Sequence, residues 1–144
     1  ILEYLLKKER YVPDTIIFLQ NTSPLRTSTH IDEAIKLFQK KKFDSLLSGY
    51  NSHKFFWKKN NLLVKPMNYS PQKRPNRQDF TNQFIENGSI YIIKHDIFKK
   101  IKSRLSGKIG LYKMPEILSI EIDTRDDLLL ASYILKTLNQ KTHK

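Results

Sequence analysis

The first fifty residues alternate between short apolar runs and an amphipathic segment, and this alternation restricts the possible folds most strongly. The run at 14–19 (DTIIFL) is bounded by polar residues, which is typical of a strand buried on both faces. Residues 29–42 carry apolar side chains at helical spacing, and 43–50 (FDSLLSGY) predict the next strand. Strands and helices in this order predict an α/β fold in which helices cover a parallel sheet.

The second half of the chain continues with strand and helix patterns. Residues 88–96 predict a strand, and residues 96–105 predict a short helix. In 117–123 (ILSIEID) apolar and acidic residues alternate, which predicts a strand with Glu121 and Asp123 on one face. A final helix is expected after Thr124, which can cap it. The predicted buried stripe of this helix consists of Leu128, Ala131, Leu135 and Leu138.

The segment between these halves is strongly basic. No acidic residue occurs between Asp44 and Asp79, and the whole chain has 26 Lys plus Arg against 14 Asp plus Glu, a formal charge of +12. Because the segment also contains several aromatic residues, it could bind nucleic acid by neutralising phosphates and stacking on bases. Against this, lysines occur throughout the chain, 20 in all, and no nucleic-acid-binding motif is present.

Several classes of protein are disfavoured by what the sequence lacks. With no cysteine, the chain has no disulfide, thiolate zinc site or cysteine nucleophile. A reducing compartment is therefore the default, and we expect the cytoplasm. No apolar stretch approaches the roughly 18 residues needed to cross a bilayer, so no membrane partner is expected. The motifs of zinc proteases, α/β-hydrolases and P-loop enzymes are also absent.

The strongest candidate for chemistry is the acidic pair Glu121 and Asp123. Two residues apart on a strand, their side chains would leave the same face about 7 Å apart. Mg²⁺ takes one or two carboxylates together with water and substrate phosphates, and this pair could supply them. A solvated strand face followed by a helix cap is the simpler explanation, and from spacing alone it is favoured about two to one.

Two further groups of polar residues lie beside predicted strands. Residues 20–26 (QNTSPLR) directly follow the first strand and contain Gln20, Ser23 and Arg26, which can bind sugar hydroxyls, carboxylates or phosphates. An ordinary turn explains this segment equally well. The second group surrounds the strand at 88–96, where solvated loop charges and a half-buried aromatic are the better explanation. This group consists of Arg74, Arg77, Gln78, Asp79, Glu86, Asn87, Gly88 and Tyr91.

Taken in order, four blocks of sequence resemble one known family. They are DTIIFLQNTSPLRTSTHIDEAI, RPNRQD, ENGSIYI, and LYKMPE followed by SIEIDTRDDL. Together they are similar to the acylneuraminate cytidylyltransferases, the CMP-sialic acid synthetase family. The resemblance covers the carboxy-terminal two thirds of such an enzyme and implies a three-layer αβα Rossmann-like nucleotidyltransferase fold without its amino-terminal part. Because that part carries the loop for the CTP phosphates, we expect the 144 residues alone to be inactive.

The resemblance implies that CTP and a nonulosonic (sialic-type) sugar acid react to give a CMP-sugar and pyrophosphate, with Mg²⁺ required. The metal-binding carboxylates of the family's I-D-I-D-T segment map onto Glu121 and Asp123, so the first has one more methylene here. Gln20 matches a sugar-contacting glutamine, and Tyr91 matches a tyrosine that lines the sugar pocket. Arg77 matches a basic residue that approaches the neighbouring subunit's sugar site. Substrate-binding roles are also expected for Ser23, Arg26, Gln78 and Asn87.

The family also gives the basic middle segment a role. Residues 51–84 would be an arm that crosses to a second subunit of a homodimer, with apolar anchors at Phe55, Phe56, Trp57, Leu62 and Leu63. Its cations would surround the triphosphate and the sugar carboxylate, which explains the charge better than nucleic acid does. Ile85 stands where some relatives carry an arginine, and ENG is similar to relatives that act on legionaminic or pseudaminic acid. A non-catalytic remnant of the same fold is the remaining alternative.

Overall fold

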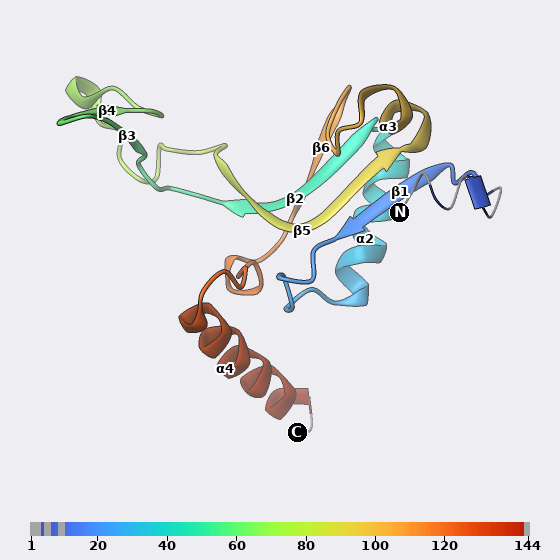
Figure 1. Cartoon of the computed structure of the whole chain (residues 1–144). Helices are drawn as coiled ribbons and strands as arrows, with labels where there is room; N and C mark the ends of the chain where they lie inside the picture. Colours follow the sequence, from blue (N-terminus) through green and yellow to red (C-terminus); the bar gives the residue numbers. More distant parts are fainter. Residues whose placement is uncertain (1–3, 5–6, 9–10, 143–144) are drawn as a thin grey trace. The chain divides into compact units, whose positions relative to one another are not determined.

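A four-stranded sheet forms the centre of the larger of two compact units. The computed structural model describes residues 4, 7–8 and 11–142 of the chain. The larger unit contains the residues up to Tyr50 and from Glu86 onward, and residues 51–85 form the smaller one. The sheet has the strand order β1-β5-β2-β6 (Figure 1). Its strands are β1 (Thr15–Leu19), β2 (Ser45–Asn51), β5 (Phe84–Lys94) and β6 (Ile109–Lys113).

The sheet is mixed, which corrects the prediction of a parallel sheet. β2 and β6 are parallel, whereas β1 and β5 are antiparallel, with Ile17 opposite Ile92. The arrows of β2 and β5 also run in opposite directions in Figure 1. After β2 the chain forms the 51–85 unit and then enters β5 directly. Because no helix carries the chain back across the sheet, β5 cannot run parallel to β2.

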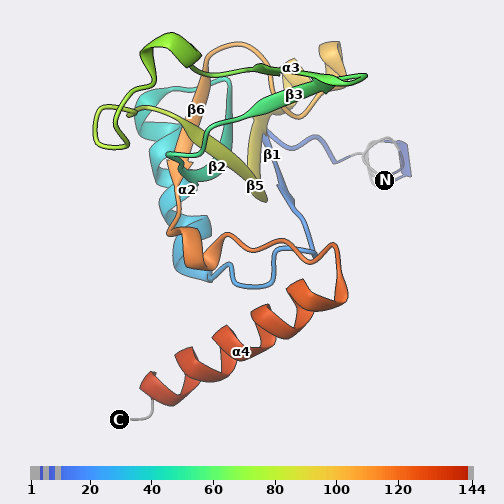
Figure 2. The same ribbon diagram turned by 90° about the vertical axis from the view of Figure 1, so that its left-hand side faces the viewer.

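One face of the sheet is covered by α2 (Ser28–Lys41), as Figures 1 and 2 show. The helix begins at the N-cap Thr27, whose side chain accepts a hydrogen bond from the backbone N–H of His30. Ala34 and Phe38 point from the helix into the main core. The rest of that core consists of Leu46, Ile90, Ile92, Tyr112 and Met114. The apolar spacing of 29–42 therefore predicted this helix to within one residue at each end.

The opposite face is contacted by α3 (His95–Ile101). Side chains alternate along a strand, so Phe18 lies on the face opposite to Ile17, and its ring centroid is 5.7 Å from that of Phe98 in α3. The helix is shorter than the predicted 96–105 because Lys102 adopts a left-handed conformation at its C-cap. A mixed sheet with helices on both faces is compatible with a Rossmann-like fold.

The last helix, α4 (Arg125–Thr142), begins as predicted but buries a narrower stripe. Thr124 caps it: its hydroxyl accepts from the backbone N–H of Asp127, and the Asp127 carboxylate accepts from the backbone N–H of Thr124. Ala131 and Ile134 are buried. The predicted stripe is wrong at three positions that remain exposed, Leu128, Leu135 and Leu138. Helical spacing shows which face can be buried, whereas the partner decides how much of it is buried.

The smaller unit contains an antiparallel hairpin of β3 (Trp57–Asn60) and β4 (Leu63–Pro66), followed by η1 (Pro71–Lys73). Beneath it, the ring of Phe55 packs against those of Tyr69 and Phe80, with centroids 4.6 Å and 4.8 Å away. At the tip of the hairpin, Leu62 is 94% exposed and Leu63 72% exposed. Among the described helices of both units, none is long and apolar enough to cross a membrane.

Candidate active site

The loop after β1 and the segment before α4 meet at the carboxyl end of β1. The backbone N–H of Ile122 donates to the carbonyl of Thr22 over 2.8 Å. Figure 2 shows this part of the chain, between η2 (Glu116–Leu118) and α4, running beside the loop that follows β1. The contact brings the predicted metal pair to the end of the strand from which Gln20 projects.

The segment that carries the acidic pair is irregular, which corrects the predicted strand at 117–123. After η2, the Ser119 hydroxyl donates to the carbonyl of Pro115 over 2.9 Å and accepts from the side-chain amide of Asn87 over 2.8 Å. The backbone at Ser119 is not extended, with a φ of −104° and a ψ of 23°. Contacts with other parts of the chain, and not a strand, therefore position the segment that carries the acidic pair.

Gly88 is the point on which two predicted site residues converge. Its φ of +61° is a conformation that glycine adopts without strain. A Cβ atom built on Gly88 would lie 2.0 Å from Oε1 of Glu121 and 2.5 Å from Oε1 of Gln20. The two side chains therefore lie directly over the backbone of β5, in space that any other residue would fill.

The site carries a concentration of negative charge around Glu121. Burial raises the pKa of the Glu121 carboxyl, and the nearby charges of Asp123 and Glu86 raise it further. The charges of Asp123 and Glu86 each oppose the ionisation of Glu121, and a bound cation would relieve that repulsion. Within the described residues, no group of three or more His, Cys, Asp or Glu side chains has the geometry of a metal site. The available donors, two carboxylates and the Gln20 amide oxygen, are hard oxygen ligands that suit Mg²⁺.

Tyr91 is buried beside this cluster, and its hydroxyl donates to Oε1 of Glu86. Burial, and then the carboxylate of Glu86, raise the pKa of Tyr91. The guanidinium of Arg104 lies over the ring, 4.6 Å from its centroid. The sequence placed Tyr91 in the site and grouped Glu86 with it as a polar residue beside the strand, but it gave Glu86 no specific function and did not single out Arg104. The position of Glu86 next to Asn87 and Gly88 was the one available signal.

Asn87 is buried, and its side-chain amide is bonded within the protein. Its amide N–H₂ donates to Ser119 over 2.8 Å and contacts the sulfur of Met114 at 3.4 Å. Its amide oxygen accepts from the hydroxyl of Ser48 over 2.6 Å and from the backbone N–H of Ser89 over 3.2 Å. Asn87 therefore ties β2, β5 and the segment before α4 together directly beneath Gly88.

The other predicted residues of the β1 loop are also bonded internally. Ser23 is buried, and its hydroxyl donates to the carbonyl of Asn87 over 3.3 Å. Arg26 donates to the carbonyls of Gln20 and Ser89 over 3.0 Å and 2.8 Å, and burial lowers its pKa. These bonds fix the loop that presents Gln20. Direct substrate contacts by Ser23 and Arg26 stay predictions.

Two predicted site residues belong to the smaller unit. Arg77 and Gln78 are exposed in a turn in which the backbone N–H of Asp79 donates to the carbonyl of Asn76 over 3.1 Å. The remaining predicted residues, Gln20, Ser23, Arg26, Asn87, Tyr91, Glu121 and Asp123, all belong to the larger unit. The role of Arg77 and Gln78 stays a prediction.

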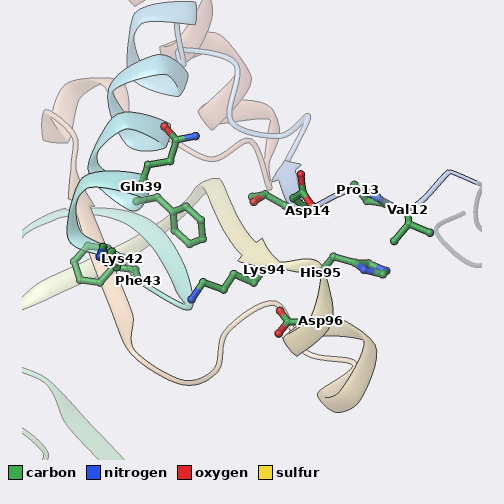
Figure 3. Close-up of a pocket in the computed structure, with 11 residues that line it drawn as sticks. Val12, Pro13, Asp14, Gln39, Lys42, Phe43, Lys94, His95 and Asp96 are labelled. Carbon is green, nitrogen blue, oxygen red and sulfur yellow. The ribbon is translucent and has the colours of Figure 1, made fainter.

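A cavity of about 610 Å³ lies at the opposite end of β1 from Gln20 (Figure 3). It is lined by Thr15 at the start of β1, Phe38 and Gln39 of α2, and Lys94 and His95 at the junction of β5 and α3. None of the predicted site residues lines it. β1 has five residues, so the cavity and the carboxylate cluster are separated by at least about 13 Å along the strand.

Comparison with known proteins identifies the relatives of this chain. No family model matches it. It is 35% identical over 118 residues to N-acylneuraminate cytidylyltransferase A of Danio rerio and 33% identical over 118 residues to N-acylneuraminate cytidylyltransferase of Oncorhynchus mykiss. The chain is a relative of the N-acylneuraminate cytidylyltransferases. The enzyme of that name from a Streptococcus agalactiae serotype III strain is 30% identical over 116 residues.

The match covers most of this chain but a small part of its relatives. It includes 79% of this chain and 27% of each fish cytidylyltransferase. For the Streptococcus agalactiae protein the shares are 78% and 28%. The chain therefore spans about a quarter of the length of the curated relatives it matches. These matches confirm that the chain is similar to the N-acylneuraminate cytidylyltransferases, as the four sequence blocks predicted.

Proposed function

We propose that this chain provides the sugar-acid and metal-binding part of a CTP-dependent cytidylyltransferase that activates a nonulosonic sugar acid. The observation that carries the proposal is the convergence of Gln20 and Glu121 over Gly88. It occurs in a chain related over most of its length to N-acylneuraminate cytidylyltransferases. The kinship does not favour the nucleic-acid-binding alternative.

The reaction is a nucleotidyl transfer. The anomeric hydroxyl oxygen of the sugar acid forms a bond to the α-phosphorus of CTP, and the bond from that phosphorus to the bridging oxygen of the β-phosphate breaks. Pyrophosphate leaves, and the hydroxyl proton passes to solvent. Catalysis of such a transfer depends on positioning and electrostatic stabilisation more than on covalent chemistry by the protein.

The carboxylates of Glu121 and Asp123 would hold Mg²⁺, which polarises phosphate oxygens and stabilises the charge that develops on them. Gln20, whose amide lies with Glu121 over Gly88, would orient the sugar acid beside the metal. The raised pKa of Glu121 supports this assignment, because a site that disfavours its own negative charge gains most from a cation.

The residues beneath the site would act by holding it in place. Asn87 bonds the segment that carries the metal pair, while Ser23 and Arg26 bond the loop that carries Gln20. We propose that Arg77 and Gln78 contribute to the sugar site from a second subunit. The exposed apolar tip of the β3–β4 hairpin supports a homodimer in which the 51–84 arm makes the contact.

The direct test is a pyrophosphate-release assay on the polypeptide that carries these 144 residues. It should contain CTP, Mg²⁺ and a panel of neuraminic, legionaminic and pseudaminic acids. Release with at least one acid, and its loss when EDTA removes Mg²⁺, are expected. The 144-residue chain alone should bind a sugar acid without turnover. If no acid of the panel releases pyrophosphate, the proposed function is wrong.

A further inference from the structure

We propose that Glu86 contacts the sugar acid and determines its specificity, and that Tyr91 is the positioning residue that holds Glu86 in place. This inference rests on the proposed function and adds a residue to the same site. Glu86 lies in β5, two residues before Gly88, over which Gln20 and Glu121 converge.

The hydrogen bond from Tyr91 fixes one carboxylate oxygen of Glu86 and leaves the other oxygen available to a ligand. Tyr91 is only 3% exposed, and its hydroxyl donates to Oε1 of Glu86. Its ring is also covered by the guanidinium of Arg104. A buried and covered ring cannot turn away, so it anchors the carboxylate. Glu86 itself is exposed, and no second hydrogen-bond donor reaches its carboxylate from the part of the chain that the structure describes.

The pair borders the carboxylate cluster. The charge of Glu86 acts on Glu121, and the charge of Glu121 acts in turn on Tyr91. Glu86 lies two residues before Gly88 on β5, and the carboxylate of Glu121 lies over that glycine although it is about 35 residues from Glu86 in sequence. A ligand that reaches Glu121 therefore also passes Glu86.

The chemistry of a carboxylate decides what it can bind. An ionised carboxylate only accepts hydrogen bonds, so Glu86 must bind a donor, either a sugar hydroxyl or the N–H of an acylamino group. It repels the carboxylate of the sugar acid and the phosphates of CTP. The sugar must then lie with its carboxylate away from Glu86 and with a hydroxyl or amide toward it, which sets both orientation and choice of substrate.

The chain contains a matched control for this pair. Tyr112 in β6 is buried, and its hydroxyl donates to Glu33 of α2, as Tyr91 donates to Glu86. Burial and Glu33 account for the raised pKa of Tyr112, with no contribution from Glu121 or Asp123. Breaking this second pair removes the same kind of hydrogen bond without touching the proposed site.

The experiment compares E86Q, Y91F and E33Q in the polypeptide that carries this chain, with equilibrium binding of each sugar acid and separate KM values for sugar and CTP. Loss of a charged acceptor weakens binding about tenfold or more, so E86Q should raise the sugar KM by that factor and leave the CTP KM within about twofold. Y91F should raise the sugar KM less, because the carboxylate remains. E33Q should change neither KM.

The possible outcomes separate this inference from the proposed function. If no sugar acid binds to the wild-type protein, both fail. If the wild type binds one and E86Q binds it equally well, or if E86Q raises the CTP KM as much as the sugar KM, Glu86 has no specificity role and the inference alone fails. If the E86Q protein has a lower melting temperature than the E33Q protein, its KM values could reflect lost stability, and the Y91F variant decides instead. A sugar KM that is unchanged in Y91F overturns the inference.

Discussion

At the scale of single residues, the site depends on the absence of one side chain. Gly88 leaves open the space that Glu121 and Gln20 occupy, and its φ of +61° is a conformation that other residues rarely adopt. The sequence alone predicted that Gln20 and the acidic pair share a region, because strands of α/β sheets present ligand-binding residues at their carboxyl ends. It could not predict the hydrogen bond from Tyr91 to Glu86, because the sequence does not show the backbone conformation at Gly88, which lies between them.

Gly88→Ala should destabilise the protein and remove activity together. A non-glycine residue at this φ costs about 1–2 kcal/mol, and its Cβ would collide with Glu121 and Gln20. Gly107→Ala is the control, because Gly107 has a φ of +67° and the atoms nearest to its added Cβ belong to Asp44. Both variants should melt at lower temperature, and only Gly88→Ala should lose sugar-acid binding below the melting point. Equal binding by the two variants would contradict the account.

At the scale of elements, the sequence predicted those that local pattern determines. The sequence predicted the ends of β1, α2 and β2 to within two residues, because each has a clear apolar pattern that is bounded by polar or turn residues. The segment 117–123 alternates as a strand does, yet it is irregular, since its backbone and Ser119 bond to the β1 loop and to Asn87. β6 was missed because its five residues, IGLYK, carry too little pattern to be distinguished from a loop.

Asn87→Ala should loosen three elements at once. The variant removes the acceptor of the buried Ser48 hydroxyl and one of the two hydrogen-bond partners of the Ser119 hydroxyl, which should reduce the free energy of unfolding by about 2–3 kcal/mol. Urea denaturation measures this, with the exposed Asn76→Ala as a control that should change stability by less than about 1 kcal/mol. Should the two variants unfold at the same urea concentration, Asn87 does not hold these elements together.

At the scale of the whole molecule, positive charge is concentrated in the 51–85 unit, which also exposes apolar side chains. It contains seven cations and one acidic residue, and its hairpin tip exposes Leu62 and Leu63. A chain that leaves such a tip in water carries a solubility cost unless a partner covers it. The internal packing of Phe55 on Tyr69 and Phe80 shows that not every predicted anchor is free for that purpose.

The dimer is tested by light scattering after size-exclusion chromatography. The wild-type protein should elute as a dimer, and the double variant Leu62→Asp, Leu63→Asp should elute as a monomer, because two charges would be buried at the contact. Leu129→Asp, which changes an exposed leucine on α4, should remain dimeric. A monomeric wild type, or a dimeric double variant, would rule out this use of the arm.

The central claim is that an acidic pair at the carboxyl end of β1 supports cytidylyl transfer, and one comparison of variants tests it most directly. Pyrophosphate release should be measured for Asp123→Ala and for Asp126→Ala, which removes a carboxylate three residues later in the first turn of α4. Asp123→Ala should lower turnover by at least about 100-fold with an unchanged melting temperature, and Asp126→Ala should retain near-normal turnover. Near-normal turnover by Asp123→Ala would contradict the account.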